Sequence, residues 1–133
     1  MSVETAKAYF RIADDPDGTV EELAGLFAED ATLISPREGV FEGRDEIEEF
    51  FFLNVEFFAE GSHSLRNYYT DGDTVICEGT IEGKTTAGRS YEGVGFVDVV
   101  ECDGDEITDF RIYLDYSGLL TELPDEVPDY RNV

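Results

Sequence analysis

Hydrophobic residues in the first half of the chain recur with the spacing of α-helices. A first helix is predicted from apolar positions three and four residues apart: Val3, Ala6, Tyr9, Phe10 and Ala13. Ser2 can cap this helix, and the acidic turn 14–18 ends it. The capping-box sequence TVEE at 19–22 opens a short second helix. A third helix begins after Gly43 and is unusually aromatic, with its last apolar residue at Phe58.

From residue 63 onward, apolar and polar residues alternate with the period of two that is typical of β-strands. Strands are predicted near four ranges, joined by turns that contain glycine: 63–70, 74–83, 89–102 and 106–115. A shorter strand is predicted over 31–34, and Pro36 ends it because its ring disfavours continued pairing. Helices followed by hairpin-linked strands indicate an α+β fold, with three N-terminal helices packed on one face of a curved antiparallel sheet. We expect one domain over 1–120 and an acidic, irregular tail over 121–133.

The composition predicts a folded chain with an unusual charge. Of the 133 residues, 41% are hydrophobic, and 10 Phe and 7 Tyr can build a core. The 9 basic and 32 acidic residues give a net charge of −23. Because the acids are scattered along the chain, the surface repels nucleic acid and anionic membranes, and neither is an expected partner.

Lysine is confined to Lys7 and Lys84. Scattered acid with little lysine is typical of proteins from a salt-rich cytoplasm, where molar salt shortens the Debye length to about 3 Å and screens self-repulsion. An ordinary acidic protein is the alternative. No run of about 20 apolar residues and no signal pattern at the N-terminus is found, so a cytoplasmic location in a halophilic organism is expected.

The sequence offers no signature of a metal or cofactor site. Cys77 and Cys102 lie in predicted strands without CxxC or Cys/His spacing, which favours buried free thiols over a disulfide. No glycine-rich phosphate loop and no nucleophile elbow is found, and no cofactor is expected. The acidic turn 14–18 is interpreted as a solvated turn, with weak cation binding as the alternative.

One carboxylate interrupts an apolar strand. In GFVDVV, at 95–100, alternation places Asp98 on the same face as Phe96. An isolated buried carboxylate is unfavourable, so a protein raises its pKa, hydrogen-bonds it or gives it a charged partner. Two interpretations stay open. Asp98 pairs with Arg89, Arg111 or a backbone amide and fixes the strand register, or it keeps a proton that it can donate or move.

Several segments resemble the superfamily that groups nuclear transport factor 2 (NTF2), ketosteroid isomerase and SnoaL-type polyketide cyclases. They are YFRIAD, VEELAGLFAEDATLISP, FEGRDEIEEFF, HSLRN, GDTV and GRSYEGVGFVDVVECDGDEITDFRIYLD. The resemblance extends to about Leu120, and its motifs mark the fold more strongly than the function. It implies a cone, in which a strongly bent sheet wraps the helices around an apolar pocket and the outer face of the sheet forms a dimer.

Two residues match the site of ketosteroid isomerases. The resemblance places Tyr9 where those enzymes have the tyrosine of the oxyanion hole, and Asp98 where they have its protonated aspartic acid. Ser35 stands just before the proline of the first strand, where the isomerases have their general base. Because a serine cannot act as that base at neutral pH, the resemblance does not extend to steroid isomerisation.

Other branches of the superfamily match in part. Glu78, Thr80 and Ile112 stand where the epoxide hydrolases have catalytic arginine and aspartate residues, so that reaction is not expected. His63 resembles the pocket histidine of scytalone dehydratases and several SnoaL-like proteins, where it carries protons, as an imidazole can near neutral pH. The alternative is a histidine exposed in a loop. Asp115 lies near the pocket mouth in cyclases, but alternation places it on the polar strand face, where a surface pair is expected.

These matches predict a cofactor-free isomerase, cyclase or dehydratase that acts on a small apolar carbonyl compound. Tyr9 and a protonated Asp98 would stabilise an enolate oxygen, and His63, on the same strand face as Asn67, would carry the proton. The predicted ligand-binding residues are Phe51, Phe58, Asn67, Phe96, Phe110 and Ile112. The alternative is a non-catalytic module for hydrophobic ligands or dimerisation, in which an arginine pairs with Asp98 and His63 faces solvent. A homodimer and a small apolar ligand are the expected partners.

Overall fold

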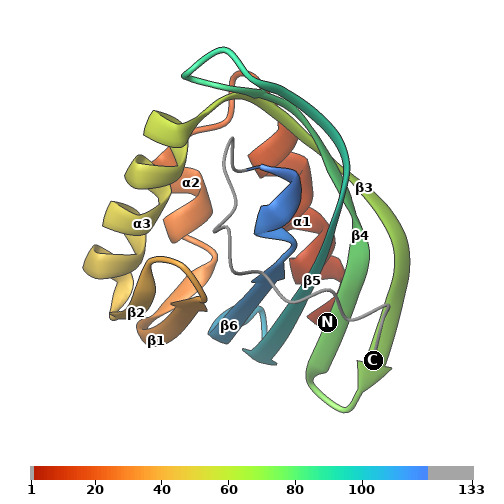
Figure 1. The fold of residues 1–133 in the computed structure, drawn as a ribbon. Helices are drawn as coiled ribbons and strands as arrows, with labels where there is room; N and C mark the ends of the chain where they lie inside the picture. Colours follow the sequence, from red (N-terminus) through yellow and green to blue (C-terminus); the bar gives the residue numbers. More distant parts are fainter. Residues whose placement is uncertain (1, 120–133) are drawn as a thin grey trace, which may run out of the picture.

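A strongly curved sheet of six strands wraps around three helices in the computed structural model, which describes residues 2–119 (Figure 1). The elements in chain order are α1 (Ser2–Asp14), α2 (Val20–Ala24), β1 (Phe27–Ser35), β2 (Gly39–Glu42), α3 (Arg44–Phe57), β3 (Phe58–Asp71), β4 (Thr74–Thr85), β5 (Ser90–Asp103), β6 (Glu106–Leu114) and the 3-10 helix η1 (Tyr116–Gly118). The α+β class and the three helices agree with the sequence. The expected tail over 121–133 lies outside the described residues.

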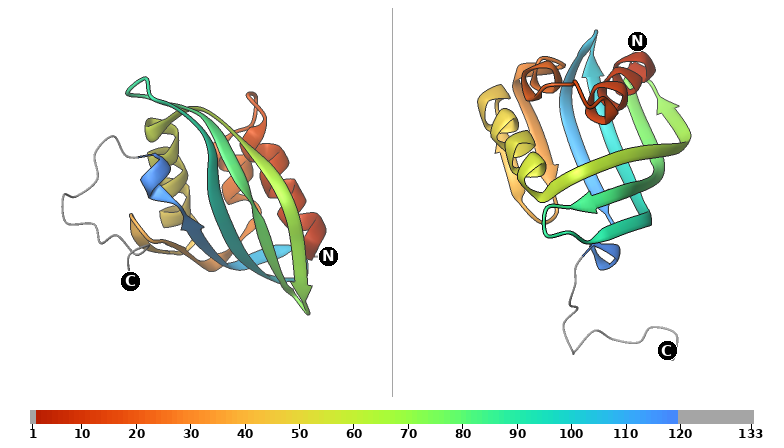
Figure 2. Two further views of the ribbon diagram at one scale, coloured as in Figure 1. Left: turned by 45° about the vertical axis from the view of Figure 1, so that its right-hand side comes forward. Right: turned by 90° about the horizontal axis from the view of Figure 1, so that it is seen from above.

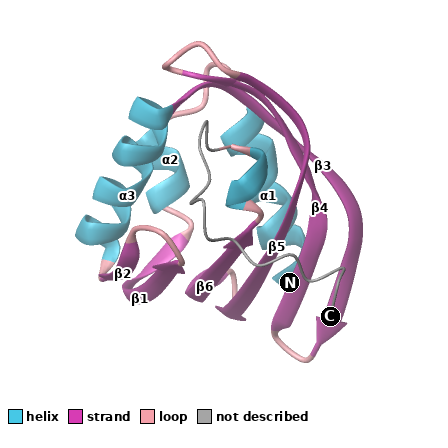
Figure 3. Ribbon diagram, in the orientation of Figure 1, coloured by secondary structure: helices cyan, strands magenta, loops and turns pink. Residues whose placement is uncertain are grey.

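The sheet is mixed, with the strand order β2-β1-β6-β5-β4-β3 (Figure 3). Four neighbouring pairs are antiparallel, but β1 and β6 run parallel, so the expectation of an antiparallel sheet is wrong for this pair. The reason is the chain path. After β1 and β2, the chain crosses over through α3 and builds β3 to β5 as hairpins, and β6 then returns beside β1. Strand β2 has only four residues, too few for a recognisable alternation.

A local signal in the sequence sets the start of the second helix. Thr19 and Glu22 form the predicted capping box, with Glu22 N–H donating to the Thr19 hydroxyl at 3.1 Å and Thr19 N–H donating to the Glu22 carboxylate at 3.1 Å. The third helix ends at Phe57, and Phe58 begins β3, five residues earlier than predicted. The aromatic residues that suggest one long helix are therefore divided between α3 and the start of β3.

Strand β3 contains a bulge that changes which side chains face the helices. Leu65 pairs with Gly79, but Asn67 pairs with Glu78, so Arg66 is an extra residue. One extra residue reverses the alternation beyond it. Asn67 therefore lies on the outer face, where its amide donates to Glu78 at 3.2 Å, and the expectation that it shares the face of His63 is wrong. Gly79 fits the bulge because a Cβ there would collide with the Ser64 carbonyl oxygen of β3.

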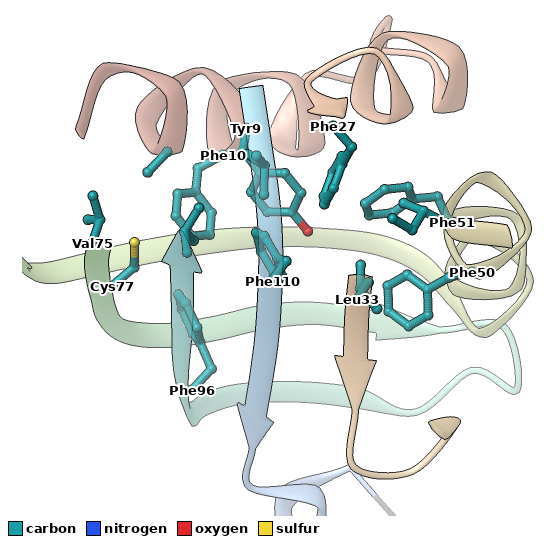
Figure 4. Close-up of a cluster of buried hydrophobic side chains, with 14 of the residues drawn as sticks. Tyr9, Phe10, Phe27, Leu33, Phe50, Phe51, Val75, Cys77, Phe96 and Phe110 are labelled. Carbon is teal, nitrogen blue, oxygen red and sulfur yellow. The ribbon is translucent and has the colours of Figure 1, made fainter. Parts of the chain in front are cut away.

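The helices cover the concave side of the sheet, as the two views of Figure 2 show, and the hydrophobic core lies between the helices and the sheet. Its largest fully buried side chains are Phe27, Phe50, Phe51, Phe110, Leu33 and Ile47. Figure 4 shows the Tyr9 side chain extending from α1 towards the sheet, with its hydroxyl oxygen reaching the interior. Within residues 2–119, no helix is long and apolar enough to cross a membrane.

Candidate functional site

A cavity of about 80 Å³ lies between the helices and the concave face of the sheet. Its walls are mainly aromatic and aliphatic, from residues that include Phe50, Phe57, Phe58, Ile81, Phe96, Ile112 and Leu114. Eight residues with polar side-chain groups also line it: Tyr9, Ser35, Arg37, Glu38, Asn54, His63, Asp98 and Tyr116. An apolar space with a few convergent polar groups is the usual form of a small-molecule site.

Asp98 is the buried acid in the wall of this cavity. Its side chain is 4% exposed, and β5 holds it between Cys77 of β4 and Ile112 of β6. Burial raises the pKa of Asp98 well above its ordinary value of 3.8, which favours the protonated carboxyl group. Within residues 2–119, no hydrogen bond or ion pair of the protein engages this side chain. Its proton is therefore available to a molecule in the cavity.

Within residues 2–119, neither of the two arginines suggested as partners for Asp98 forms an ion pair with it. Arg111 lies on the other face of the sheet, where it pairs with Glu101 at 2.7 Å and with Asp109. Arg89 lies at the β4–β5 turn, where its backbone N–H donates to the Thr85 hydroxyl at 3.2 Å and its side-chain Nε is buried without a hydrogen-bond partner among the described residues. The interpretation of Asp98 as one half of a structural ion pair is therefore wrong for these arginines.

Tyr9 contributes a second protonated group to the same cavity. Helix α1 buries its ring to 6% exposure, packed on Phe110 with the ring centroids 4.8 Å apart. Burial, and then the charge that Asp98 would carry, raise the pKa of Tyr9 well above 10.0. Tyr9 and Asp98 line the same cavity, and neither the hydroxyl nor the carboxyl group has a protein partner among the described residues. The cavity wall therefore contains two groups that can donate hydrogen bonds to a bound molecule.

His63 and Asp14 form a hydrogen-bonded pair at the edge of the cavity. His63 Nδ1 lies 2.6 Å from Asp14 Oδ1, and the His63 backbone N–H donates to Asp14 Oδ2 at 3.0 Å. The ring packs between Phe10 and Phe96, with centroid distances of 5.0 and 5.3 Å. A histidine held in this way has one ring nitrogen occupied and the other, Nε2, available for proton transfer.

A third polar group lies on the turn between β1 and β2. The hydroxyl of Ser35, which is 2% exposed, donates to Glu38 Oε2 in a short hydrogen bond. The Tyr116 hydroxyl donates to the same oxygen at 3.4 Å, and burial raises the pKa of Tyr116. This hydrogen bond fixes the Glu38 carboxylate beside Ser35 in the wall of the cavity.

The cavity meets a larger open groove of about 660 Å³. Residues common to both are Tyr9, Asn54, Phe58, His63 and Ile81. The groove runs between the end of α1, the end of α3 and the start of β3, and Asp14 and Phe51 also line it. A ligand larger than the cavity can place one end inside and the remainder in the groove.

The structure places the predicted site residues in four different surroundings. Tyr9, His63 and Asp98 line one cavity, as do Phe58, Phe96 and Ile112. Phe51 lines the groove instead, and Phe110 is fully buried beneath Tyr9. Asn67 lies on the outer face of the sheet because of the bulge in β3.

Asp115 and the acidic turn have other roles than those considered from the sequence. Asp115 is exposed and caps η1 by accepting the Ser117 backbone N–H at 3.1 Å, so the expected surface pair with a cation is replaced by a local cap. Asp14, interpreted as part of a solvated turn, is the partner of His63. Among residues 2–119, no cluster of three or more His, Cys, Asp and Glu side chains could hold a metal ion.

Sequence reasoning missed Asp14, Glu38 and Tyr116, whose contacts at the site depend mainly on residues far away in the sequence. Asp14 is 49 residues from its partner, and Tyr116 is 78 residues from Glu38. The one local signal is the spacing of Ser35 and Glu38 across a turn that contains Pro36. Such a turn brings side chains three residues apart together.

Solved structures with the same fold include proteins of several kinds. A protein with a ketosteroid isomerase-like fold from Catenulispora acidiphila, in complex with trimethylamine, aligns with a TM-score of 0.80 and 23% identity over 94% of this chain and 98% of that chain. An NTF2-like protein of unknown function from Burkholderia pseudomallei aligns with a TM-score of 0.79 and 18% identity over 89% and 93%. The epoxide hydrolase/cyclase-like enzyme SalBIII, from pyran ring formation in salinomycin, aligns with a TM-score of 0.74 and 23% identity over 88% and 92%.

At these identities the structural matches establish the fold alone. No curated protein sequence matches this chain. The family model of the SnoaL-like domain, however, matches residues 6–110, which covers most of the chain and includes Tyr9, Ser35, Glu38, His63 and Asp98. The chain therefore belongs to the SnoaL-like domain family.

Proposed function

We propose that this protein is a cofactor-free acid–base enzyme, an isomerase, cyclase or dehydratase, that acts on a small carbonyl compound. The observation that carries the proposal is the pair of buried groups, Tyr9 and Asp98, in the wall of one cavity, where burial raises the pKa of both. Two hydrogen-bond donors in one cavity can stabilise negative charge as it develops on a carbonyl oxygen. Loss of one such donor typically reduces the rate by about 10²–10³-fold.

His63 supports the same proposal because a proton must move whenever an enolate forms or collapses. Its Nδ1–H is held by Asp14, which can only accept when ionised, so Nε2 is left as the proton acceptor. The cavity accepts the carbonyl end of the substrate. The adjoining groove accepts an apolar remainder, since Phe51, Val55 and Leu23 line it.

The alternative of a non-catalytic binding module has less support. It requires Asp98 to be neutralised by an arginine and His63 to face solvent. Within residues 2–119, no ion pair involves Asp98, and the His63 side chain is 24% exposed and hydrogen-bonded to Asp14. Burying two proton donors without protein partners also lowers the stability of the folded protein, a cost that a ligand offsets when it accepts their hydrogen bonds.

Phenolates test the proposal because a phenolate oxygen resembles an enolate oxygen in charge and geometry. We expect substituted phenols such as 4-nitrophenol to bind as the anion, with affinity lowered about 10- to 100-fold in Tyr9→Phe and in Asp98→Asn, as for a lost hydrogen bond to a charged group. The matched controls are Tyr69→Phe and Asp103→Asn, both exposed, which should bind normally. Equal affinity in all five proteins, or no binding by the native chain, contradicts the proposal.

We also propose that the chain forms a homodimer through the outer face of its sheet. The support is the resemblance noted from the sequence and an exposed apolar row on that face. Tyr69 pairs with Ile76 and Ile76 with Val99 across three strands, and Tyr69 and Ile76 are 53% and 37% exposed. A soluble monomer rarely leaves a contiguous apolar face open to water.

A further inference from the structure

The cavity contains one arginine that the proposed acid–base chemistry leaves without a role. Arg37 lies on the turn between β1 and β2 and is, within residues 2–119, the only lysine or arginine that lines the cavity or the groove. Its guanidinium lies over the Phe57 ring, with the guanidinium carbon 5.0 Å from the ring centroid. No described residue forms an ion pair or a hydrogen bond with its side chain. A planar cation that is stacked on a ring and left unpaired presents its N–H groups to a ligand.

The neighbouring carboxylate does not occupy this arginine. Glu38 follows Arg37 in the chain, but its Oε2 accepts hydrogen bonds from Ser35 and Tyr116. Burial raises the pKa of the Tyr116 hydroxyl, and the positive charge of Arg37 acts in the opposite direction. The charge of Arg37 therefore acts on a group in the cavity wall even with Glu38 beside it.

We propose that Arg37 binds a carboxylate group of the substrate and is therefore a specificity-determining residue of the site. This inference rests on the proposed function and narrows its substrates to carbonyl compounds that carry a carboxylate. A guanidinium donates two parallel hydrogen bonds to a carboxylate, and it discriminates against a neutral ester through the lost charge. A single arginine with Glu38 beside it suits a group of one negative charge better than a phosphate dianion.

Charges along the groove set the direction in which such a substrate lies. The groove is lined by the acidic residues Asp14, Asp15 and Glu60, and by no lysine or arginine among the described residues. Arg37 lines the cavity and not the groove. A carboxylate in the groove would meet charges of its own sign, whereas at Arg37 it meets the opposite sign. The substrate therefore lies with its carboxylate at Arg37, its carbonyl at the two proton donors and its apolar part towards the groove.

Nitrophenol acids and their methyl esters test the inference. The probes 4-hydroxy-3-nitrophenylacetate and 3-(4-hydroxy-3-nitrophenyl)propanoate share a phenolate for Tyr9 and Asp98, and they place the carboxylate at two different reaches. Each acid is compared with its methyl ester by calorimetric titration at one salt concentration. We expect the native protein to bind at least one acid about tenfold more tightly than its ester, as for a charged hydrogen bond at a partly exposed site. In Arg37→Gln this preference should disappear, and the ester affinity should stay unchanged.

The matched control is Arg66→Gln, which makes the same change on an exposed arginine of β3 that lines neither the cavity nor the groove. It removes the same positive charge from the protein and should keep the preference for the acid. Arg37→Lys retains the charge but loses the planar fork, so it should keep only part of the preference. Unchanged ester affinity in each variant shows that the cavity is still formed.

The other outcomes separate this inference from the proposed function. Equal binding of acids and esters by the native protein, or a preference that remains in Arg37→Gln, overturns the inference and leaves the proposed function standing. Loss of ester binding together with acid binding in Arg37→Gln assigns Arg37 a structural role and also overturns the inference. Ester affinity that does not fall in Tyr9→Phe or Asp98→Asn contradicts the proposed function, even where the preference for the acid depends on Arg37. No binding of any probe by the native protein contradicts both.

Discussion

The Asp14 carboxylate accepts two hydrogen bonds from one residue, His63, at 2.6 Å from the ring nitrogen Nδ1 and at 3.0 Å from the backbone N–H. The first bond orients the imidazole, and the second joins the last residue of α1 to β3. A single side chain therefore fixes both the helix end and the proton carrier against the sheet. Catalytic imidazoles depend on such a partner for their tautomer and orientation.

Replacement of Asp14 should separate catalysis from folding. In Asp14→Asn, the amide can donate to Nδ1 and so favours the other tautomer, which places the proton on Nε2. We expect turnover of a substrate found for the enzyme to fall about 100-fold or more, as for lost general acid–base catalysis. The control is Asp17→Asn in the same exposed turn. An unchanged rate in Asp14→Asn would show that His63 moves no proton in the rate-limiting step.

Tyr9 and Tyr91 form a matched pair for stability. Both are buried, at 6% and 7% exposure, but only Tyr91 has a protein partner among the described residues, the Glu60 carbonyl at 3.3 Å. Loss of a satisfied hydroxyl should lower the free energy of unfolding, and loss of an unsatisfied one should raise it, each by about 1 kcal/mol. Thermal or urea unfolding of Tyr9→Phe and Tyr91→Phe measures the difference. A similar loss in both variants would mean that the Tyr9 hydroxyl is not free for a ligand.

The sequence predicts the Tyr9 and Asp98 part of the site because each position follows from a regular period. Tyr9 lies on the apolar stripe of one helix, and Asp98 lies on the apolar row of a strand without a bulge between Phe96 and Val100. A regular period carries a side chain to a known face. The superfamily resemblance then places the two faces opposite each other.

The remaining site residues depend on irregular geometry. The extra residue Arg66 reverses the face of Asn67, and no local pattern marks it. Glu38 reaches the cavity because a four-residue turn folds it back onto Ser35, and Asp14 meets His63 because α1 ends beside β3. The parallel pairing of β1 with β6 is likewise a property of the chain path rather than of either strand.

A charged residue on the outer face of the sheet should separate the protomers of the proposed dimer. Ile76 lies in the middle of the exposed apolar row, so Ile76→Glu would bury a carboxylate in the interface. We expect sedimentation velocity to change from dimer to monomer. The control, Val40→Glu, alters an apolar residue that is 57% exposed on the edge strand β2 and should leave the dimer intact. A native chain that sediments as a monomer contradicts the proposal.

The net charge of −23 should make stability depend on salt. Self-repulsion destabilises the compact state, and molar salt reduces the Debye length to about 3 Å. We expect the melting temperature to rise continuously from low salt to multimolar KCl. It should rise far less in sucrose of the same osmolality, because sucrose is excluded from the protein surface but does not screen charge. Equal melting temperatures in low and high KCl would contradict an adaptation to salt.

The buried Asp98 should make stability fall as pH rises. Because burial raises its pKa well above 3.8, the native state holds this proton after the unfolded chain has released it. Stability therefore declines above about pH 4, by about 1.4 kcal/mol per pH unit, until the native pKa is reached. Asp98→Asn removes this slope, so its stability relative to the native protein should increase with pH. Urea unfolding at several pH values measures the difference, and Asp103→Asn on the exposed end of β5 supplies the control. A difference between native and Asp98→Asn that stays constant with pH would mean that Asp98 is ionised in the native state, and it could not then donate to an oxyanion.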